Sequence, residues 1–422
     1  MSKSKISVFE ILIAIYYTWF FMPIVNAYFS GEVFKYLFFG MFALGVLGMV
    51  VIKNRAWQVP FNHLTIAVLA YFIVMLFMYL CNLGDARDHI RVSFTFWGTA
   101  LVYFYSLNNE ERIRMGKFFL LLFIVTCITS SIGVVLDNNA ARTITHAAAD
   151  DNLQYAYYMK NIGSIYLFQC MVMAMPLVVA LAKEKRDKIF SAIIIVTTAL
   201  VLINASFTIA LLVFFVGISL SVLFLKSKSY TDLFIKICLV CLLLILVSAG
   251  KDILSWFASV IDNDSIKSRI LELVDLIYEG AGTEGDVDLR LNLYMTSIKT
   301  FLRNPLGVGP WYSYVIYSNG IGYHSQILDD LARYGLFALA FYIMFFIGYY
   351  RLLKSEWQGI VDTKTAAITV ALYAVFLILN LGFRSGIESV VMLFLVPIVP
   401  KIVAGWKEKR KKFFGHLERQ DI

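Results

Sequence analysis

Long apolar runs, each about as long as a lipid bilayer is thick, recur along this chain and constrain its fold more than any other feature. A helix needs about 20 apolar residues to cross a bilayer core of about 30 Å, whereas the strands of a membrane barrel need only about 10. Hydrophobic residues make up 60% of the 422 positions and charged residues only 16%. A soluble domain has about 25% charged residues. The sequence therefore predicts an all-α polytopic membrane protein.

Hydropathy predicts about twelve transmembrane helices in a single membrane domain that covers residues 1–422. The predicted spans lie near residues 6–26, 33–52, 61–82, 92–107, 118–136, 163–182, 189–204, 207–226, 232–249, 335–352, 364–382 and 388–405. Around Asn204–Thr208 the connection is so short that one long bent helix is an alternative. The first apolar run lacks the small-residue cleavage site of a signal peptide, so we interpret it as a span.

Lysines and arginines concentrate in alternate loops, and the formal net charge of the chain is +8. The basic set comprises Lys3 and Lys5, the loops at 53–55, 112–117, 183–188, 226–228 and 351–354, and the tail 407–412. The other short loops hold only Arg87, Arg91, Arg142, Lys160 and Arg384. Cytoplasmic loops carry the excess of positive charge, so both termini are predicted in the cytoplasm. This bias explains the net charge without a nucleic-acid partner.

Residues 250–334 form the one long polar interval, which is predicted as a large extracytoplasmic loop between spans nine and ten. Its sequence predicts a first short helix after Asp264, with apolar residues at helical spacing as far as Ile277. A second helix is predicted from about Asp288 to Leu302, because a residue before proline, here Asn304, resists the helical conformation. Gly307 and Gly309 then allow a tight reversal. A loop of this length is more often a lid or a binding element than a spacer.

Two residues of this interval are candidates for catalysis. His324 precedes a predicted helix start, and an imidazole with an ordinary pKa near 6.5 can accept a proton from a hydroxyl at neutral pH. The alternative is a histidine that only forms hydrogen bonds at the membrane interface. Arg290 begins the second loop helix, and a guanidinium binds phosphate oxygens in a fixed fork. The alternative there is a solvated helix end paired with Asp286 or Asp288.

Other residues on the same side are candidates for substrate binding. Arg142, Arg303 and Arg384 would favour an anionic glycan or a lipid-linked phosphate, and Tyr323 could stack on a sugar ring. Most aromatic residues at this depth belong instead to interfacial belts. The sequence has no phosphate-binding glycine loop after a strand and no His, Cys or carboxylate cluster with metal spacing, so it predicts neither a nucleotide-driven pump nor a metal-dependent reaction.

Two motifs in the loop resemble the O-antigen polymerase and ligase superfamily. His324-Ser325, nine residues and then Gly335 is similar to its signature of His, then Asn, Ser or Gln, nine positions and Gly-x-x-Gly. Arg290, followed by a helix and Pro305-Leu-Gly-Val-Gly309, resembles its outer-loop pattern. Two departures stand out. The last glycine is Ala338, and residues 205–208 lack the arginine that ligases usually carry near their eighth span, which favours the polymerase branch.

The resemblance implies a membrane-embedded glycosyltransferase of GT-C-like architecture in the bacterial cytoplasmic (inner) membrane. It implies an undecaprenyl-diphosphate-linked oligosaccharide as donor, a second such glycan as acceptor, no cofactor, and a chain-length regulator and a flippase as further partners. By matching position, His324 would take the proton from the acceptor hydroxyl and Arg290 would hold the diphosphate. We expect a polymerase of O-antigen or capsular type. A ligase that transfers finished glycan to a lipid-core or protein acceptor is the alternative, and a transporter of lipid-linked sugar is a third hypothesis.

Overall fold

A computed structural model of the chain describes only part of its 422 residues. The described residues are 6–52, 63–80, 98–100, 102–103, 109–145, 151–205, 207–224, 230–260, 267–268, 270–271, 274–275, 286–309, 320–380 and 387–417. Within these ranges the regular elements are all helical. The prediction of an all-α protein is therefore confirmed for the described part of the chain.

The helices of the first half are α1 (Val8–Phe21), α2 (Pro23–Tyr28), α3 (Glu32–Ile52), α4 (His63–Leu80), α6 (Asn109–Leu136), α7 (Ala140–Thr145), α8 (Asp151–Met159) and α9 (Ile165–Leu181). Those of the second half are α10 (Lys185–Asn204), α11 (Thr208–Phe224), α12 (Tyr230–Val260), α14 (Asp286–Arg303), α15 (Gln326–Tyr334), α16 (Leu336–Glu356), α17 (Thr363–Leu379), α18 (Ile387–Val390), the π-helical turn η4 (Val391–Leu395) and α19 (Val396–Leu417).

Four of the described helices, α3, α6, α10 and α16, are long and apolar enough to cross a membrane. Shorter apolar helices occur in α1, α9, α11 and α17. These helices are consistent with a polytopic membrane protein. The number of twelve spans stays a prediction, since much of the span expected at 92–107 lies outside the described residues.

The exposed face of α6 is apolar, and its buried face carries small polar residues. Ile128 and Ile132 are 55% and 56% exposed, while Thr126 and Ser130 on the opposite face are fully buried. The Thr126 hydroxyl donates to the carbonyl of Phe21 in α1 at 3.1 Å. In a membrane, small and polar residues face neighbouring helices and large apolar residues face the acyl chains. The apolar outer face of α6 therefore indicates contact with lipid.

Aromatic packing holds the first helices together. Tyr16 of α1 stacks on Phe42 of α3, with ring centroids 4.3 Å apart, and Tyr17 meets Phe119 of α6 edge-on at 4.4 Å. All four rings are fully buried. Aromatic pairs in these geometries add about 0.5–1.5 kcal/mol each beyond the area they bury. This cluster fixes the relative positions of α1, α3 and α6.

The structure settles or shifts several predicted boundaries. The chain at Asn204–Thr208 forms two helices and not one, because α10 ends at Asn204 and α11 begins at Thr208. Helix α12 continues through a non-helical Ala249 to Val260, so the helical part of the ninth predicted span extends past residue 249. The second loop helix is confirmed as α14. Most of the first, after Asp264, lies outside the described residues.

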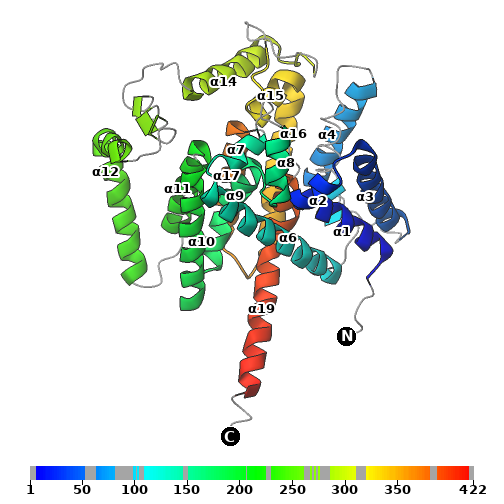
Figure 1. The fold of residues 1–422 in the computed structure, drawn as a ribbon, viewed down its shortest axis with the longest axis horizontal. Helices are drawn as coiled ribbons and strands as arrows, with labels where there is room; N and C mark the ends of the chain where they lie inside the picture. The colour runs from blue at the N-terminus through cyan, green and yellow to red at the C-terminus, as the bar shows by residue number, and fades with distance from the viewer. Residues whose placement is uncertain are drawn as a thin grey trace.

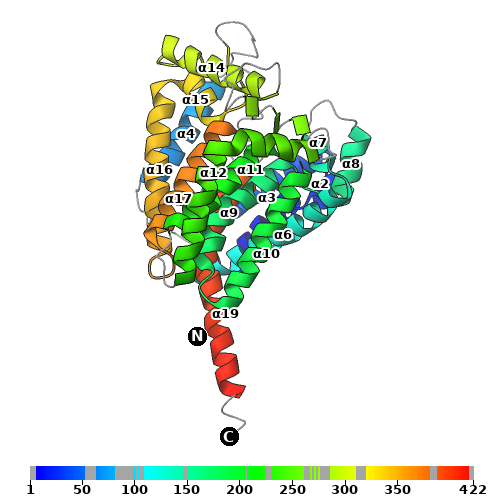
Figure 2. The same ribbon diagram turned by 90° about the vertical axis from the view of Figure 1, so that its left-hand side faces the viewer.

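Helix α14 lies across one end of the helical bundle, over α15 and the start of α16, while the free end of α19 projects from the opposite end (Figures 1 and 2). We call α14, the turn 304–309, the segment 320–325, α15 and Gly335 together the cap. The cap and the free end of α19 therefore lie at opposite ends of the bundle, and the side of the membrane on which each lies stays a prediction.

Backbone hydrogen bonds dock the turn of the cap onto the junction between α15 and α16. The amide of Leu336 donates to the carbonyl of Pro305 at 2.8 Å, and the amide of Gly309 donates to the carbonyl of Arg333 at 2.9 Å. The expected reversal is present, since Gly307 and Gly309 have φ angles of 88° and 86°. The turn therefore caps the end of α15 as well as reversing the chain.

Gly307 and Gly335 meet at this junction without side chains. A Cβ atom on Gly335 would lie 2.1 Å from the Pro305 carbonyl oxygen, and one on Gly307 would lie 2.2 Å from the Arg333 carbonyl oxygen. Gly335 also has a φ of 61°, a left-handed conformation that glycine adopts without a steric penalty. Both glycines are required by the close backbone approach.

We predict that Gly335→Ala destabilises the protein more than Gly359→Ala. Gly359 also has a positive φ, 75°, but has open space where its Cβ would be. The control should lose about 1–2 kcal/mol from backbone strain alone. Gly335→Ala adds a collision with backbone and should lower the melting temperature further. Thermal unfolding of the detergent-solubilised variants measures both, and equal shifts would contradict the docking described here.

Candidate active site

His324 lies in the cap, two residues before the first residue of α15. Its Nδ1 atom is 3.0 Å from the carbonyl oxygen of Gly322. A carbonyl oxygen can only accept, so Nδ1 is the donor in this contact, and in the neutral imidazole the lone pair is then on Nε2. The side chain is half-buried. In that tautomer Nε2 is the nitrogen that can accept a further proton.

Helix α15 begins immediately after His324 because Ser325 caps it. The Ser325 hydroxyl accepts the amide of Leu328 at 3.1 Å, which satisfies one of the free donors of the first turn. The amide of Gln326 donates to the carbonyl of Asn380, just after α17, at 3.0 Å. The Asn380 side chain in turn accepts from Gln169 of α9 at 3.1 Å. The start of α15 is thus tied to two helices of the bundle.

Tyr323 has a φ of 58°, which is unusual for a residue with a large side chain. The guanidinium carbon of Arg333 lies 4.9 Å from the centroid of its ring, a cation–π contact. Such a backbone conformation costs about 1–3 kcal/mol and persists only where the surroundings fix it. One face of the ring predicted to stack on a sugar is therefore in contact with Arg333.

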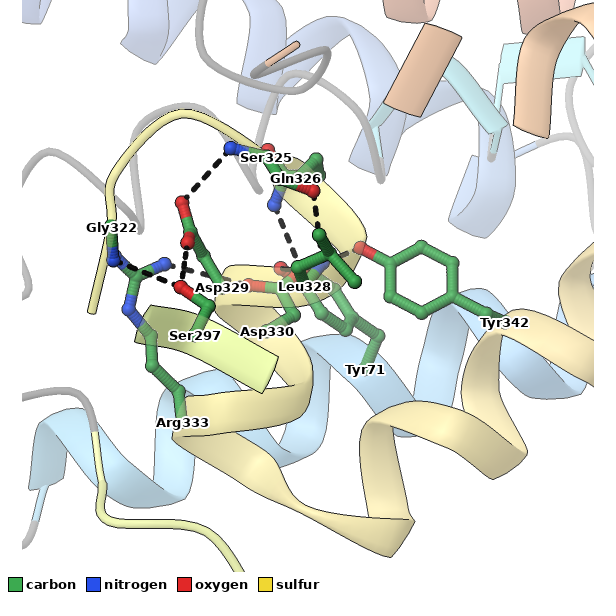
Figure 3. Close-up of polar contacts among 10 residues, drawn as sticks. All are labelled: Tyr71, Ser297, Gly322, Ser325, Gln326, Leu328, Asp329, Asp330, Arg333 and Tyr342. Carbon is green, nitrogen blue, oxygen red and sulfur yellow. Dashed lines mark hydrogen bonds and ion pairs between the residues drawn. The ribbon is translucent and has the colours of Figure 1, made fainter. Parts of the chain in front are cut away.

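The carboxylate of Asp329 is buried and binds the segment that carries His324 (Figure 3). It accepts the hydroxyl of Ser297 at 2.6 Å and the amide of Ser325 at 3.2 Å. The Ser297 oxygen also accepts the amide of Gly322 at 2.9 Å. Burial raises the pKa of Asp329, while the Ser297 hydrogen bond and the charge of Arg333 offset part of that rise.

Asp330 lies beside it, and its carboxylate joins the cap to the bundle. It accepts from Tyr342 of α16 at 2.6 Å, from Gln326 at 2.8 Å and from Tyr71 of α4 at 3.4 Å, and it pairs with Arg333 at 3.5 Å. Burial raises the pKa of Asp330, and the charge of Arg333 lowers it in part. A buried carboxylate with this many donors is satisfied, so the cap is anchored here by polar contacts.

Arg290 lies in the first turns of α14 and is half-buried. One turn later, the hydroxyl of Tyr294 donates to the carbonyl of Leu379, the last residue of α17, at 2.8 Å. Burial raises the pKa of Tyr294, and the charge and a hydrogen bond of Arg290 lower it in part. Arg290 therefore lies next to Tyr294, at the level where α14 meets the bundle.

The face of α14 that carries Arg290 also holds the segment leading to His324. Further along this face, Thr300 donates to the carbonyl of Gly320 at 2.7 Å and Ser297 accepts from Gly322. The segment therefore runs antiparallel to the helix. From Gly320 onward the chain proceeds toward the Arg290 end of α14 as it approaches His324.

The remaining predicted residues stand elsewhere. Arg303 is exposed in the last turn of α14, about 20 Å along the helix axis from Arg290 at 1.5 Å per residue. The two arginines therefore lie near opposite ends of α14. Arg142 belongs to α7, and its side chain lies outside the described part of the structure. Arg384 lies outside the described residues altogether.

Sequence analysis did not single out the buried polar residues Ser297, Asp329, Asp330 and Arg333. One signal was present in the helix after His324. Gln326, Asp329, Asp330 and Arg333 recur at helical spacing on a segment that leads directly into an apolar run. A polar stripe in that position indicates a face turned toward a protein partner and away from lipid. Ser297 carries no comparable signal, because its role depends on contacts across the cap.

We predict that Arg333→Met destabilises the protein by about 3 kcal/mol at neutral pH, since it leaves buried carboxylates without their cation. The effect should shrink at acid pH. A carboxyl with a raised pKa is most compatible with folding when protonated, and loss of Arg333 raises the pKa of Asp330 further. The penalty therefore grows as pH rises above the ordinary range of aspartate.

Melting temperatures from pH 4.5 to 8 measure this dependence. Arg186→Met serves as the control, because Arg186 is exposed and stacks on Phe190 at 5.5 Å. Its effect should stay below about 1 kcal/mol at every pH. A penalty for Arg333→Met that is constant with pH would contradict the electrostatic account.

A comparison with known protein families identifies this region. The family model described as O-antigen ligase matches residues 190–343, a range that contains Arg290, His324 and Gly335. No curated protein matches the chain significantly. Members of the family are membrane glycosyltransferase-like enzymes. The resemblance noted in the sequence is confirmed, because residues 190–343 match the O-antigen ligase family model, and this match supports the O-antigen polymerase and ligase superfamily.

Proposed function

We propose that this protein is a polymerase that joins undecaprenyl-diphosphate-linked oligosaccharide repeat units into a polysaccharide of O-antigen or capsular type. The observation that carries the proposal is the placement of His324 within the matched family domain. Its Nδ1 is bound to the Gly322 carbonyl, and its Nε2 is left as a base. The reaction takes place on the outer face of the bacterial cytoplasmic membrane, with both termini of the chain in the cytoplasm.

In this mechanism Nε2 of His324 takes the proton from a hydroxyl of the acceptor sugar. The hydroxyl oxygen forms a bond with the anomeric carbon of the donor, and the bond between that carbon and the diphosphate oxygen breaks. The electron pair of the broken bond leaves with the lipid diphosphate. General-base catalysis of this kind contributes about 10²–10⁴-fold to the rate.

Arg290 stabilises the leaving diphosphate. Its guanidinium is half-buried beside Tyr294, where water is partly excluded and a fixed positive charge acts more strongly than in bulk water. Because an arginine stays charged and offers parallel N–H donors, it can follow the charge that develops on the phosphate oxygens. Arg142, Arg303 and Arg384 are proposed to contact anionic parts of the lipid-linked glycan, and Tyr323 to contact a sugar.

The choice of polymerase over ligase rests on the sequence of residues 205–208, Ala-Ser-Phe-Thr, which leads into α11 at Thr208. Ligases of the superfamily usually carry an arginine there, and this chain has none. The second candidate is a ligase that moves finished glycan to a lipid-core or protein acceptor, and the family match supports either reaction. The two reactions share the donor and the base and differ in the acceptor.

We predict that His324→Ala and Arg290→Ala each abolish polymer formation in the native host while the protein persists in the membrane. The lipid-linked and surface glycans are separated on a gel, and the protein level is measured by immunoblot. His63→Ala is the matched control, because His63 is exposed and contacts Arg351. Arg290→Lys keeps the charge without the fork and should retain only part of the activity.

Accumulation of a single lipid-linked repeat unit in the His324→Ala strain supports a polymerase. Long polymer that stays unattached to its acceptor identifies a ligase instead. A ladder identical to that of the His63→Ala strain would contradict the assignment of His324 as the base. Loss of all glycan from the outer face, with repeat units retained inside, would indicate a transporter.

A further inference from the structure

We propose that Ser297 and Asp329 form a clamp that positions His324 for catalysis. Both lie within the matched range 190–343, but neither is one of the named residues of the two sequence motifs. The inference rests on the proposed function of His324 as the base, and it assigns these two residues a positioning role without contact with substrate. They act on the backbone on both sides of the histidine.

The clamp holds both flanks of His324 through one connected set of hydrogen bonds (Figure 3). On the near side, the Gly322 amide donates to the Ser297 oxygen at 2.9 Å. On the far side, the Ser325 amide donates to one oxygen of Asp329 at 3.2 Å. The Ser297 hydroxyl closes the set by donating to the other Asp329 oxygen at 2.6 Å. One carboxylate thus fixes residues 322 and 325 relative to α14 and α15.

Fixing Gly322 also fixes the imidazole, because the carbonyl of the same residue accepts the Nδ1 proton of His324. A shift of Gly322 would release Nδ1 and allow the ring to rotate or to change tautomer. The base at Nε2 is present only while Nδ1 carries the proton. The clamp therefore controls both where the base lies and which nitrogen serves as the base.

Two further features of the backbone explain why the segment needs such a clamp. Tyr323 holds a strained backbone conformation, and strain of that kind persists only under several restraints. Gly322 lies against α14 so closely that a Cβ atom would be 2.2 Å from the Leu293 carbonyl oxygen. Ser297 and Asp329 are 0% and 1% exposed, so water cannot replace a lost hydrogen bond there.

The first test measures the clamp without reference to activity. Amide hydrogen exchange is followed by mass spectrometry in the purified full-length protein and in the variants Ser297→Ala, Asp329→Asn and Thr300→Val. We expect exchange at Gly322 to become at least about tenfold faster in Ser297→Ala, which removes its acceptor, and exchange at Ser325 to become at least about tenfold faster in Asp329→Asn, which weakens its acceptor. Thr300→Val removes a buried hydroxyl of the same helix face that binds only the Gly320 carbonyl, so it should leave both amides protected.

The second test separates positioning from binding. Glycosyl transfer from a synthetic undecaprenyl-diphosphate-linked repeat unit is measured with protein in lipid nanodiscs. Ser297→Ala and Asp329→Asn should lower kcat at least about tenfold and leave the KM for the donor within about twofold, because the clamp does not touch the donor. Thr300→Val should change neither constant by more than about twofold.

A protected Gly322 amide in Ser297→Ala would overturn the clamp, as would a rise in KM with unchanged kcat. If Asp329→Asn does not fold, Ser297→Ala carries both tests, since it leaves the carboxylate in place. Absence of transfer by the wild-type protein would contradict the proposed function. A failure of the clamp and a failure of the proposed function are distinguished by different measurements. Hydrogen exchange tests the clamp independently of the reaction, and the transfer assay tests the function.

Discussion

The close backbone contact between Gly307 and Gly335 is the constraint on which the cap depends. It lets the turn after α14 lie directly on the junction of α15 and α16, with main-chain hydrogen bonds from Gly309 and Leu336. Helix α14 therefore lies across α15. In that position Ser297 and Thr300 of α14 bind the segment before His324. The position of the candidate site therefore depends on the two glycines Gly307 and Gly335.

The cap concentrates buried polarity at one end of an apolar bundle. Asp329, Asp330 and Arg333 are each at most 3% exposed and lie within one helix of nine residues. Buried charges are tolerated when they are paired and receive hydrogen bonds, and here hydroxyls from Ser297, Tyr342 and Tyr71 supply the donors. Helices α4, α14 and α16 are thus joined through carboxylates. This network makes α15 a rigid support for the histidine that precedes it.

Sequence reasoning located α14, the reversal at Gly307 and Gly309, and the start of α15 after His324, because these features depend on local chemistry such as proline, glycine and helix capping. The family domain followed from the spacing of His324 and Gly335. The clamp could not be predicted, since Ser297 and Asp329 are brought together only by the fold and a buried serine looks like any other in a helix. The cation–π contact of Tyr323 with Arg333 was hidden for the same reason. Arg142 and Arg384 remain predictions, because side-chain positions for them are outside the described structure.

The length of α15 explains the fixed spacing between His324 and Gly335. The nine residues between Ser325 and Gly335 are helix α15 in full, Gln326–Tyr334. One inserted or deleted residue would rotate one end of that helix against the other by about 100°, given 3.6 residues per turn. Asp329 would then face away from Ser297 whenever Gly335 faced Gly307. The spacing of nine residues is therefore the helix length at which Asp329 faces Ser297 while Gly335 faces Gly307.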